Sequence, residues 1–167
     1  MNRFFITVGY SGLFPKAPGT AGTLVSLPLG MLILIYFDAY TLFLATALIS
    51  IVAIKEINRY EEKSGTHDDK SIVIDELAGM WFALSVAPAM SIGMSEVTVL
   101  SNGFLIQSIL SFALFRYFDI AKPSIIGRID REAKGGIGVM GDDIIAGFAA
   151  GIVSAAIWQG WLYISAI

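Results

Sequence analysis

The sequence predicts an all-α membrane protein, a polytopic bundle of about five spanning helices whose N-terminus lies in the cytoplasm. The composition indicates this class, because 56% of the 167 residues are hydrophobic and only 15% are charged, against about 25% charged residues in typical soluble domains. The mean hydropathy is +0.73. Several apolar runs approach or reach the roughly 20 residues that one span needs. We expect a single membrane-embedded domain over residues 1–167.

Apolar runs and basic segments alternate along the chain. The runs cover residues 21–37, 39–54, 77–95, 97–115 and 144–167. The two short breaks at Asp38 and Glu96 hold no basic residue, so all 11 Lys and Arg fall in the other connecting segments, which are residues 1–20, 55–76 and 116–143. Inserted helical proteins keep Lys and Arg on the cytoplasmic side. These three segments are therefore predicted to face the cytoplasm and to carry the chemistry.

The first half of the chain is expected to form a loop and a helical hairpin. Residues 9–19 contain three Gly and two Pro, which disfavour a long helix and predict a structured loop. The next two runs form a hairpin that turns at Asp38. The second helix of the hairpin is expected to continue through the polar residues 55–63 and to stop at Gly65.

A second pair of spans follows a polar loop. Asp68 or Asp69 is predicted to cap a helix that begins near Ile72 and spans the membrane over residues 77–95. A turn over residues 90–96 reaches the far side of the membrane.

The last third of the chain is expected to return to the cytoplasm and cross once more. Residues 97–115 form the returning span, and residues 116–133 an interfacial helical stretch broken at Pro123. The glycine-rich residues 134–138 are predicted to be a flexible loop before the last helix, residues 144–167. Small residues four apart in the third and last spans predict that these two helices approach closely.

Composition excludes several classes of function. The chain has no cysteine, so disulfides, thiolate zinc sites and a cysteine nucleophile are ruled out. The net charge of −3, with acids interleaved among the bases, gives no case for nucleic-acid binding. His67, the one histidine, is predicted to be a surface residue rather than a base. The oligomeric state stays open.

Two pairs of acids stand at the cytoplasmic entrances of predicted spans, Asp75 with Glu76 and Asp142 with Asp143. Adjacent helical residues point about 100° apart, so one member of each pair can face the bundle interior. A single pair would be explained by the helix dipole. Two pairs, with Asp68, Asp119 and Asp130 nearby in the same compartment, favour a functional site, because ionisable groups at membrane depth are costly.

The residue types point to a hard cation and a phosphate. Carboxylates without His or Cys suit Mg²⁺, which binds through few carboxylates together with waters and substrate phosphate. Basic residues of the same compartment could clamp that phosphate, and the candidates are Lys16, Arg116, Lys122, Arg128 and Lys134. The alternative for each is an anchor to anionic lipid headgroups.

The segment around Lys16 is a second candidate for anion binding. Pro15 and Pro18 stiffen it, and it can present Lys16, Thr20 and Thr23 together with backbone N–H groups. The alternative is that Thr20 or Thr23 is an ordinary helix cap.

Four blocks of sequence combine these acids and bases with glycines and prolines. They are residues 12–20 with 22–24, residues 72–76 with 79–80, residues 116–120 with 122–123, and residues 135–140 with 142–143 and 146–147. Together, and in this order, they resemble the bacterial phosphatidylglycerophosphatase A family. The resemblance implies a bacterial inner-membrane enzyme, with its active site on the cytoplasmic face, that uses Mg²⁺ to remove the terminal phosphate of phosphatidylglycerophosphate and yields phosphatidylglycerol.

The resemblance also implies roles for individual residues. The metal and catalytic set would be Asp75, Glu76, Asp119, Asp142 and Asp143, and the phosphate binders Lys16, Arg116 and Lys122. Without a cysteine or a nearby histidine base, we expect direct attack by water that Mg²⁺ activates, with Asp75 or Asp142 orienting or deprotonating it. An aspartyl-phosphate intermediate stays open.

Two other functions compete with this interpretation. A CDP-alcohol phosphotransferase also places acids on membrane helices, but its Asp-Gly and Ala-Arg pairs are missing from this chain. A small cation transporter would use the acids as a translocation site, although such acids should lie near the bilayer midplane.

Overall fold

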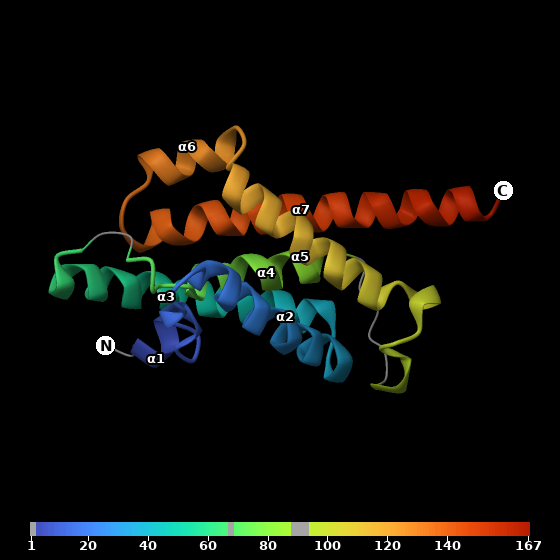
Figure 1. Ribbon diagram of the computed structural model, residues 1–167, viewed down its shortest axis with the longest axis horizontal. Helices are drawn as coiled ribbons and strands as arrows, with labels where there is room; N and C mark the ends of the chain where they lie inside the picture. The colour runs from blue at the N-terminus through green and yellow to red at the C-terminus, as the bar shows by residue number, and fades with distance from the viewer. Residues whose placement is uncertain (1–2, 67–68, 88–93) are drawn as a thin grey trace.

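The computed structural model describes residues 3–66, 69–87 and 94–167, and all regular secondary structure in this part of the chain is helical. The α-helices are α1 (Arg3–Ile6), α2 (Pro18–Tyr36), α3 (Ala39–Ser64), α4 (Ile74–Val86), α5 (Phe104–Ala121), α6 (Ile125–Glu132) and α7 (Gly135–Ser165). Three short 3-10 helices join them, η1 (Ser11–Leu13), η2 (Met94–Glu96) and η3 (Leu100–Asn102). Figure 1 shows α1, α6 and the start of α7 toward one end, and the C-terminus at the other.

Four helices, α2, α3, α5 and α7, are long and apolar enough to cross a membrane. Large apolar side chains are exposed along their outer faces, among them Leu24, Leu29, Phe43, Leu48, Ile109 and Ile152. Exposed apolar area on this scale marks a surface that meets lipid rather than water. The prediction of a multi-pass helical membrane protein is confirmed at this level, while the number of five spans and the cytoplasmic N-terminus stay predictions.

The helix predicted to span residues 77–95 is instead the short central helix α4. Its 13 residues extend about 20 Å, less than the roughly 30 Å of a bilayer core, so the span is not confirmed. Nine of the 13 residues of α4 are buried, because α2, α3, α5 and α7 all pack around it. The helix ends where Ala87 turns extended (φ −60°, ψ 140°), as expected for a residue that precedes a proline.

Two predicted helix starts in the second half of the chain are wrong. The returning helix α5 begins at Phe104 and not at residue 97, because η2, η3 and the left-handed Gly103 (φ 77°) come first. The predicted flexible loop over residues 134–138 is mostly the first turn of α7. A Cβ on Gly138 would lie 2.6 Å from the carbonyl oxygen of Ala133, so at this position glycine allows close packing rather than flexibility.

The predictions for the first hairpin hold in most details. Asp38 caps α3 by accepting a hydrogen bond from the Thr41 N–H (2.6 Å), and the left-handed Gly65 ends that helix. The helix α2 begins earlier than predicted, at Pro18, so Thr20 and Thr23 lie within its first turns and neither is the cap.

The loop before α4 differs from the prediction. The helix begins at Ile74 after Val73, and Asp69 does not cap it; its Oδ1 accepts from the Ser71 N–H (2.9 Å) inside the preceding turn. Asp68 and His67 lie outside the described residues. The predicted break at Pro123 is confirmed, since α5 ends at Ala121 and α6 begins at Ile125.

Candidate active site

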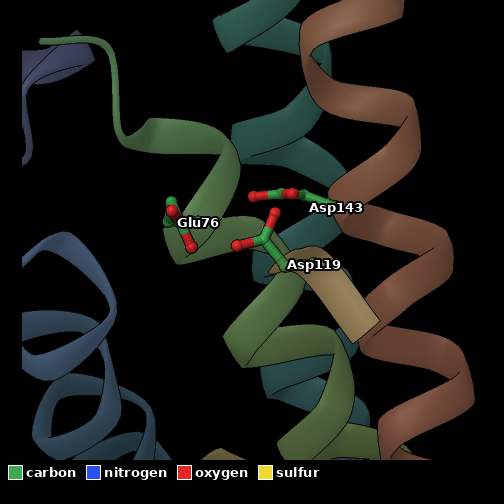
Figure 2. A group of neighbouring side chains, drawn as sticks. All are labelled: Glu76, Asp119 and Asp143. Atoms are coloured by element: carbon green, nitrogen blue, oxygen red, sulfur yellow. The ribbon is translucent and has the colours of Figure 1, made fainter. Parts of the chain in front are cut away.

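Three carboxylates from three different helices meet inside the bundle. Glu76 of α4, Asp119 of α5 and Asp143 of α7 each offer an oxygen atom within 4.8 Å of the others. Figure 2 shows these side chains converging on one region between the helices. Glu76 and Asp143 are buried, with 8% and 4% of their surfaces exposed. We call these three residues the carboxylate group.

Close contact between α4 and α7 brings two members of the group together. A Cβ on Gly147 would overlap the carbonyl oxygen of Gly79, and a Cβ on Gly79 would lie 2.6 Å from the carbonyl oxygen of Asp143. The two helix backbones therefore touch directly beneath the acids. The predicted close approach of these helices through small residues is confirmed.

Asp75 and Asp142, the other members of the two acid pairs, line the same cavity. The cavity has a volume of about 90 Å³, and its wall includes Asp75, Glu76, Asp119, Lys122, Asp130, Asp142 and Asp143. Asp75 Oδ1 accepts a hydrogen bond from the N–H of Glu76 (2.9 Å). All five acids predicted from the sequence therefore belong to one site.

Arg116 is bound to the carboxylate group. Its Nη1 forms an ion pair with Glu76 Oε2 and another, at 2.9 Å, with Asp119 Oδ2. Only 15% of the Arg116 side chain is exposed. Arg116 was expected to bind phosphate, and in this structure it neutralises two of the predicted metal ligands.

The first turns of α2 close the site on the side of Glu76. The Thr23 hydroxyl donates a hydrogen bond to Glu76 Oε2 (2.9 Å) and accepts one from Arg116 Nη1 (3.3 Å). A Cβ on Gly19 would overlap Glu76 Oε1. Thr23 thus has a role that the sequence did not suggest: its hydroxyl holds the carboxylate of Glu76 rather than a bound phosphate.

Lys122 also lines the cavity. Its Nζ donates to Asp142 Oδ2 (2.7 Å) and forms an ion pair with Asp130 of α6. Partial burial alone would lower the pKa of Lys122, but the two carboxylates raise it above its usual value, so the ammonium stays charged. Lys122 is therefore a permanent positive charge on the cavity wall.

Lys122 and Arg116 are the only predicted phosphate binders that form ion pairs with acids of this cavity in the described part of the chain, and Lys16, Thr20, Arg128 and Lys134 do not. Lys16 is exposed and Thr20 half-buried, and within the described residues no hydrogen bond or ion pair joins either side chain to the carboxylate group. Lys16 lies just before α2, so it is near the end of the helix that carries Thr23. Its role in phosphate binding stays a prediction.

Sequence reasoning missed two residues that shape the site. Asp130 was noted only as a nearby acid, although its side chain lines the cavity. Asn58 of α3 was read as part of a polar extension, yet its Oδ1 accepts a hydrogen bond from the Gly136 N–H (2.6 Å) and so caps α7 from another helix. Neither role has a local signal, because each depends on contact with another helix.

The donor set fits a hard divalent cation. Five carboxylates line the cavity besides Asp130, and only Arg116 and Lys122 among the described residues pair with them. Asp143 has no cationic partner in the described part of the chain. A buried carboxylate is costly unless a cation balances it, and an all-oxygen donor set suits Mg²⁺.

The comparisons with known proteins agree with this geometry. Residues 4–158 match the sequence model of phosphatidylglycerophosphatase A. The chain belongs to the phosphatidylglycerophosphatase A family. The family predicted from the four sequence blocks is therefore confirmed, and with it the reaction class, that of a phosphomonoesterase acting in lipid metabolism.

Individual relatives cover nearly the whole chain. It is 36% identical to phosphatidylglycerophosphatase A of Haemophilus influenzae, over 94% of this chain and 88% of the relative. It is 34% identical to the Escherichia coli protein of the same name, over 89% of this chain and 79% of the relative. A Bacteroides thetaiotaomicron protein provisionally named phosphatidylinositol-3-phosphatase is 33% identical, over 89% of this chain and 88% of the relative. No solved structure matches.

Proposed function

We propose that the protein is a Mg²⁺-dependent phosphatase that hydrolyses the terminal phosphomonoester of phosphatidylglycerophosphate to phosphatidylglycerol and phosphate. The reaction would take place at the cytoplasmic face of a bacterial inner membrane. The observation that carries the proposal is the meeting of Glu76, Asp119 and Asp143 from three helices, in a cavity that Lys122 also lines.

The carboxylate group would hold Mg²⁺, with Asp75 and Asp142 on the wall around it. When bound, the cation supplies a Lewis acid that withdraws charge from the phosphoryl oxygens and lowers the pKa of water. The protein contributes the fixed geometry, because the acids lie on three helices, α4, α5 and α7, that pack against one another.

The cationic side chains would bind and orient the phosphate. Lys122 offers a permanent charge at the cavity, and Arg116 offers a guanidinium adjacent to the carboxylate group. Charge on the equatorial phosphoryl oxygens is the main electrostatic demand of phosphoryl transfer. Lys16 would add a third charge from the segment before α2.

Asp75 is our candidate for the residue that accepts a proton from the attacking water. Its carboxylate lines the cavity and, in the described part of the chain, pairs with no cationic side chain, whereas Asp142 already accepts a hydrogen bond from Lys122. The water oxygen bonds to phosphorus as the ester P–O bond breaks. The alcohol oxygen of phosphatidylglycerol takes up a proton as it leaves.

The test is phosphate release by purified protein from phosphatidylglycerophosphate in detergent micelles, with Mg²⁺ or with EDTA. Wild-type protein should release phosphate only with Mg²⁺, and Asp143→Asn should reduce the rate by at least about 100-fold, since the carboxylate group loses a charge. Asp38→Asn is the matched control, because Asp38 lies in the α2–α3 turn and Asn also caps helices well.

Three results would contradict the proposal. Normal Mg²⁺-dependent release by Asp143→Asn would remove the carboxylate group from the mechanism. Faster release from phosphatidylinositol 3-phosphate than from phosphatidylglycerophosphate would indicate that the preferred substrate is the lipid in the name of the Bacteroides relative. Absence of release from either lipid would favour the transporter alternative.

A further inference from the structure

Asp130 lies at the mouth of the cavity, on the short helix α6. We propose that Asp130 is a positioning residue that orients the ammonium of Lys122 toward the substrate phosphate. This role rests on the proposed function, in which Lys122 binds that phosphate. It assigns a task to α6, which otherwise only connects α5 to α7.

The geometry around Lys122 Nζ supports the assignment. A lysine ammonium has three N–H donors. One donates to Asp142 Oδ2 of α7 at 2.7 Å and one to Asp130 Oδ1 of α6. Two acceptors on different helices fix the rotation of the ammonium, so the direction of the third donor is fixed as well. That donor is the one left for a ligand in the cavity.

The backbone of α6 is held against Lys122. A Cβ on Gly127 would lie 2.5 Å from the carbonyl oxygen of Lys122, so the helix and the lysine backbone are in direct contact. Lys122 has a left-handed backbone conformation (φ 42°). On α6, the side chain of Ile126 is buried in the core. Asp130 is therefore presented to Lys122 by a fixed backbone.

The exposure of the three side chains orders them from the interior to the rim. Asp142 is 8% exposed, Lys122 32% and Asp130 38%. A phosphate that enters from water meets Lys122 and Asp130 before it reaches the buried acids. Without Asp130, only Asp142 would hold the flexible four-carbon side chain of Lys122.

Positioning and simple electrostatics predict opposite effects of removing Asp130. A negative charge at the mouth repels phosphate, so by charge alone its loss should lower KM. If Asp130 orients Lys122, loss of its oxygen should raise KM. The amide oxygen of Asn still accepts a hydrogen bond from Lys122, so Asp130→Asn should keep most of the orientation while losing the charge.

The experiment measures steady-state hydrolysis of phosphatidylglycerophosphate at saturating Mg²⁺. We expect Asp130→Ala to raise KM roughly fivefold to tenfold, less than the loss of a buried hydrogen bond to a charged group would, because both side chains are about one-third exposed. We expect kcat and the Mg²⁺ concentration for half-activation to stay within about twofold, and Asp130→Asn to restore KM to near the wild-type value. Glu132→Ala is the matched control, since it removes an exposed ion-paired carboxylate from the same helix, 3.1 Å from Arg128 Nε.

A double-mutant cycle provides the second measurement. If Asp130 acts through Lys122, Asp130→Ala should add nothing to the KM of Lys122→Met. An unchanged or lowered KM in Asp130→Ala, or full additivity of the two substitutions, would overturn the role of Asp130. The proposed function would still stand in that case, provided that the wild-type protein releases phosphate. Wild-type protein that releases no phosphate would overturn both.

Discussion

Replacing Arg116 by Gln should destabilise the protein when Mg²⁺ is withheld, and Mg²⁺ should then stabilise the variant more than the wild type. Arg116 pairs with Glu76 and Asp119, two of the three residues of the carboxylate group. In the variant these carboxylates lose their positive partner. A bound cation would take over that role, so the variant should depend on it more strongly.

The size of the effect follows from the geometry. One ion pair at 2.9 Å has a Coulomb energy of about 6 kcal/mol at an effective dielectric constant of 20. Desolvation offsets much of this energy, and breaking a buried pair by removing one partner costs about 3–5 kcal/mol. The side chains of Arg116 and Asp119 are 15% and 14% exposed, which favours the lower end of that range. For a protein of this size, about 3 kcal/mol lowers the melting temperature by roughly 6–12 °C.

The assay is thermal unfolding in detergent, with EDTA and with a series of Mg²⁺ concentrations. Arg128→Gln is the control, because Arg128 pairs with Glu132 at 3.1 Å while both side chains are more than 60% exposed; such surface pairs contribute about 0–1 kcal/mol. If Arg116→Gln and the wild type have the same melting temperature in EDTA, Arg116 does not offset the negative charge of Glu76 and Asp119. If Mg²⁺ shifts both proteins equally, Arg116 and the cation do not share the same carboxylates.

Two further predictions concern helix contact and pH. Gly147→Val should lower the free energy of unfolding by about 3 kcal/mol or more and abolish phosphate release, because the added atoms overlap Gly79. Gly160, on the same helix, has open space around it, so Gly160→Val is the control and should melt at the wild-type temperature. Equal melting temperatures of the two variants would contradict the close α4–α7 contact. The Tyr60 hydroxyl, which donates to Asp69 at 2.5 Å, lowers the pKa of Asp69 together with the backbone of residue 71. A lowered pKa stabilises the fold above the unfolded pKa of about 3.9, and this stabilisation is lost as pH falls through the folded pKa. The difference in melting temperature between wild type and Tyr60→Phe should therefore narrow between about pH 5 and pH 3, and a constant difference over this range would refute the reasoning.

The members of the site could be predicted from the sequence because charge is rare in this chain. Only 15% of residues are charged, so Asp75 with Glu76 and Asp142 with Asp143 stand out at the ends of apolar runs. Their partners could not be predicted. Whether Arg116 points at a phosphate or at Glu76 depends on how α5 is rotated against α4, and this rotation comes from side-chain packing across the bundle.

The helix boundaries predicted from hydropathy and glycine content were wrong in places, and the reasons are physical. A helix that is apolar on every side can face lipid or be enclosed by other helices, and a hydropathy window does not distinguish the two. The enclosed α4 was for that reason predicted to be a full span. Glycine likewise marks either a flexible loop or a close contact. Gly136 and Gly138 belong to the second kind, since their added Cβ atoms would meet the backbone of Ile54 and of Ala133.

The enclosed position of α4 explains how a membrane protein can keep acids at a reactive site. Asp75 and Glu76 lie in the first turn of α4, where the helix dipole favours negative charge. Asp143 lies eight residues after the start of α7, so α7 extends about 12 Å beyond the level of the carboxylate group. The acids are therefore recessed below the end of a neighbouring helix. In the proposed reaction, a lipid phosphate would enter this recess and leave bulk water while its acyl chains stay in the bilayer.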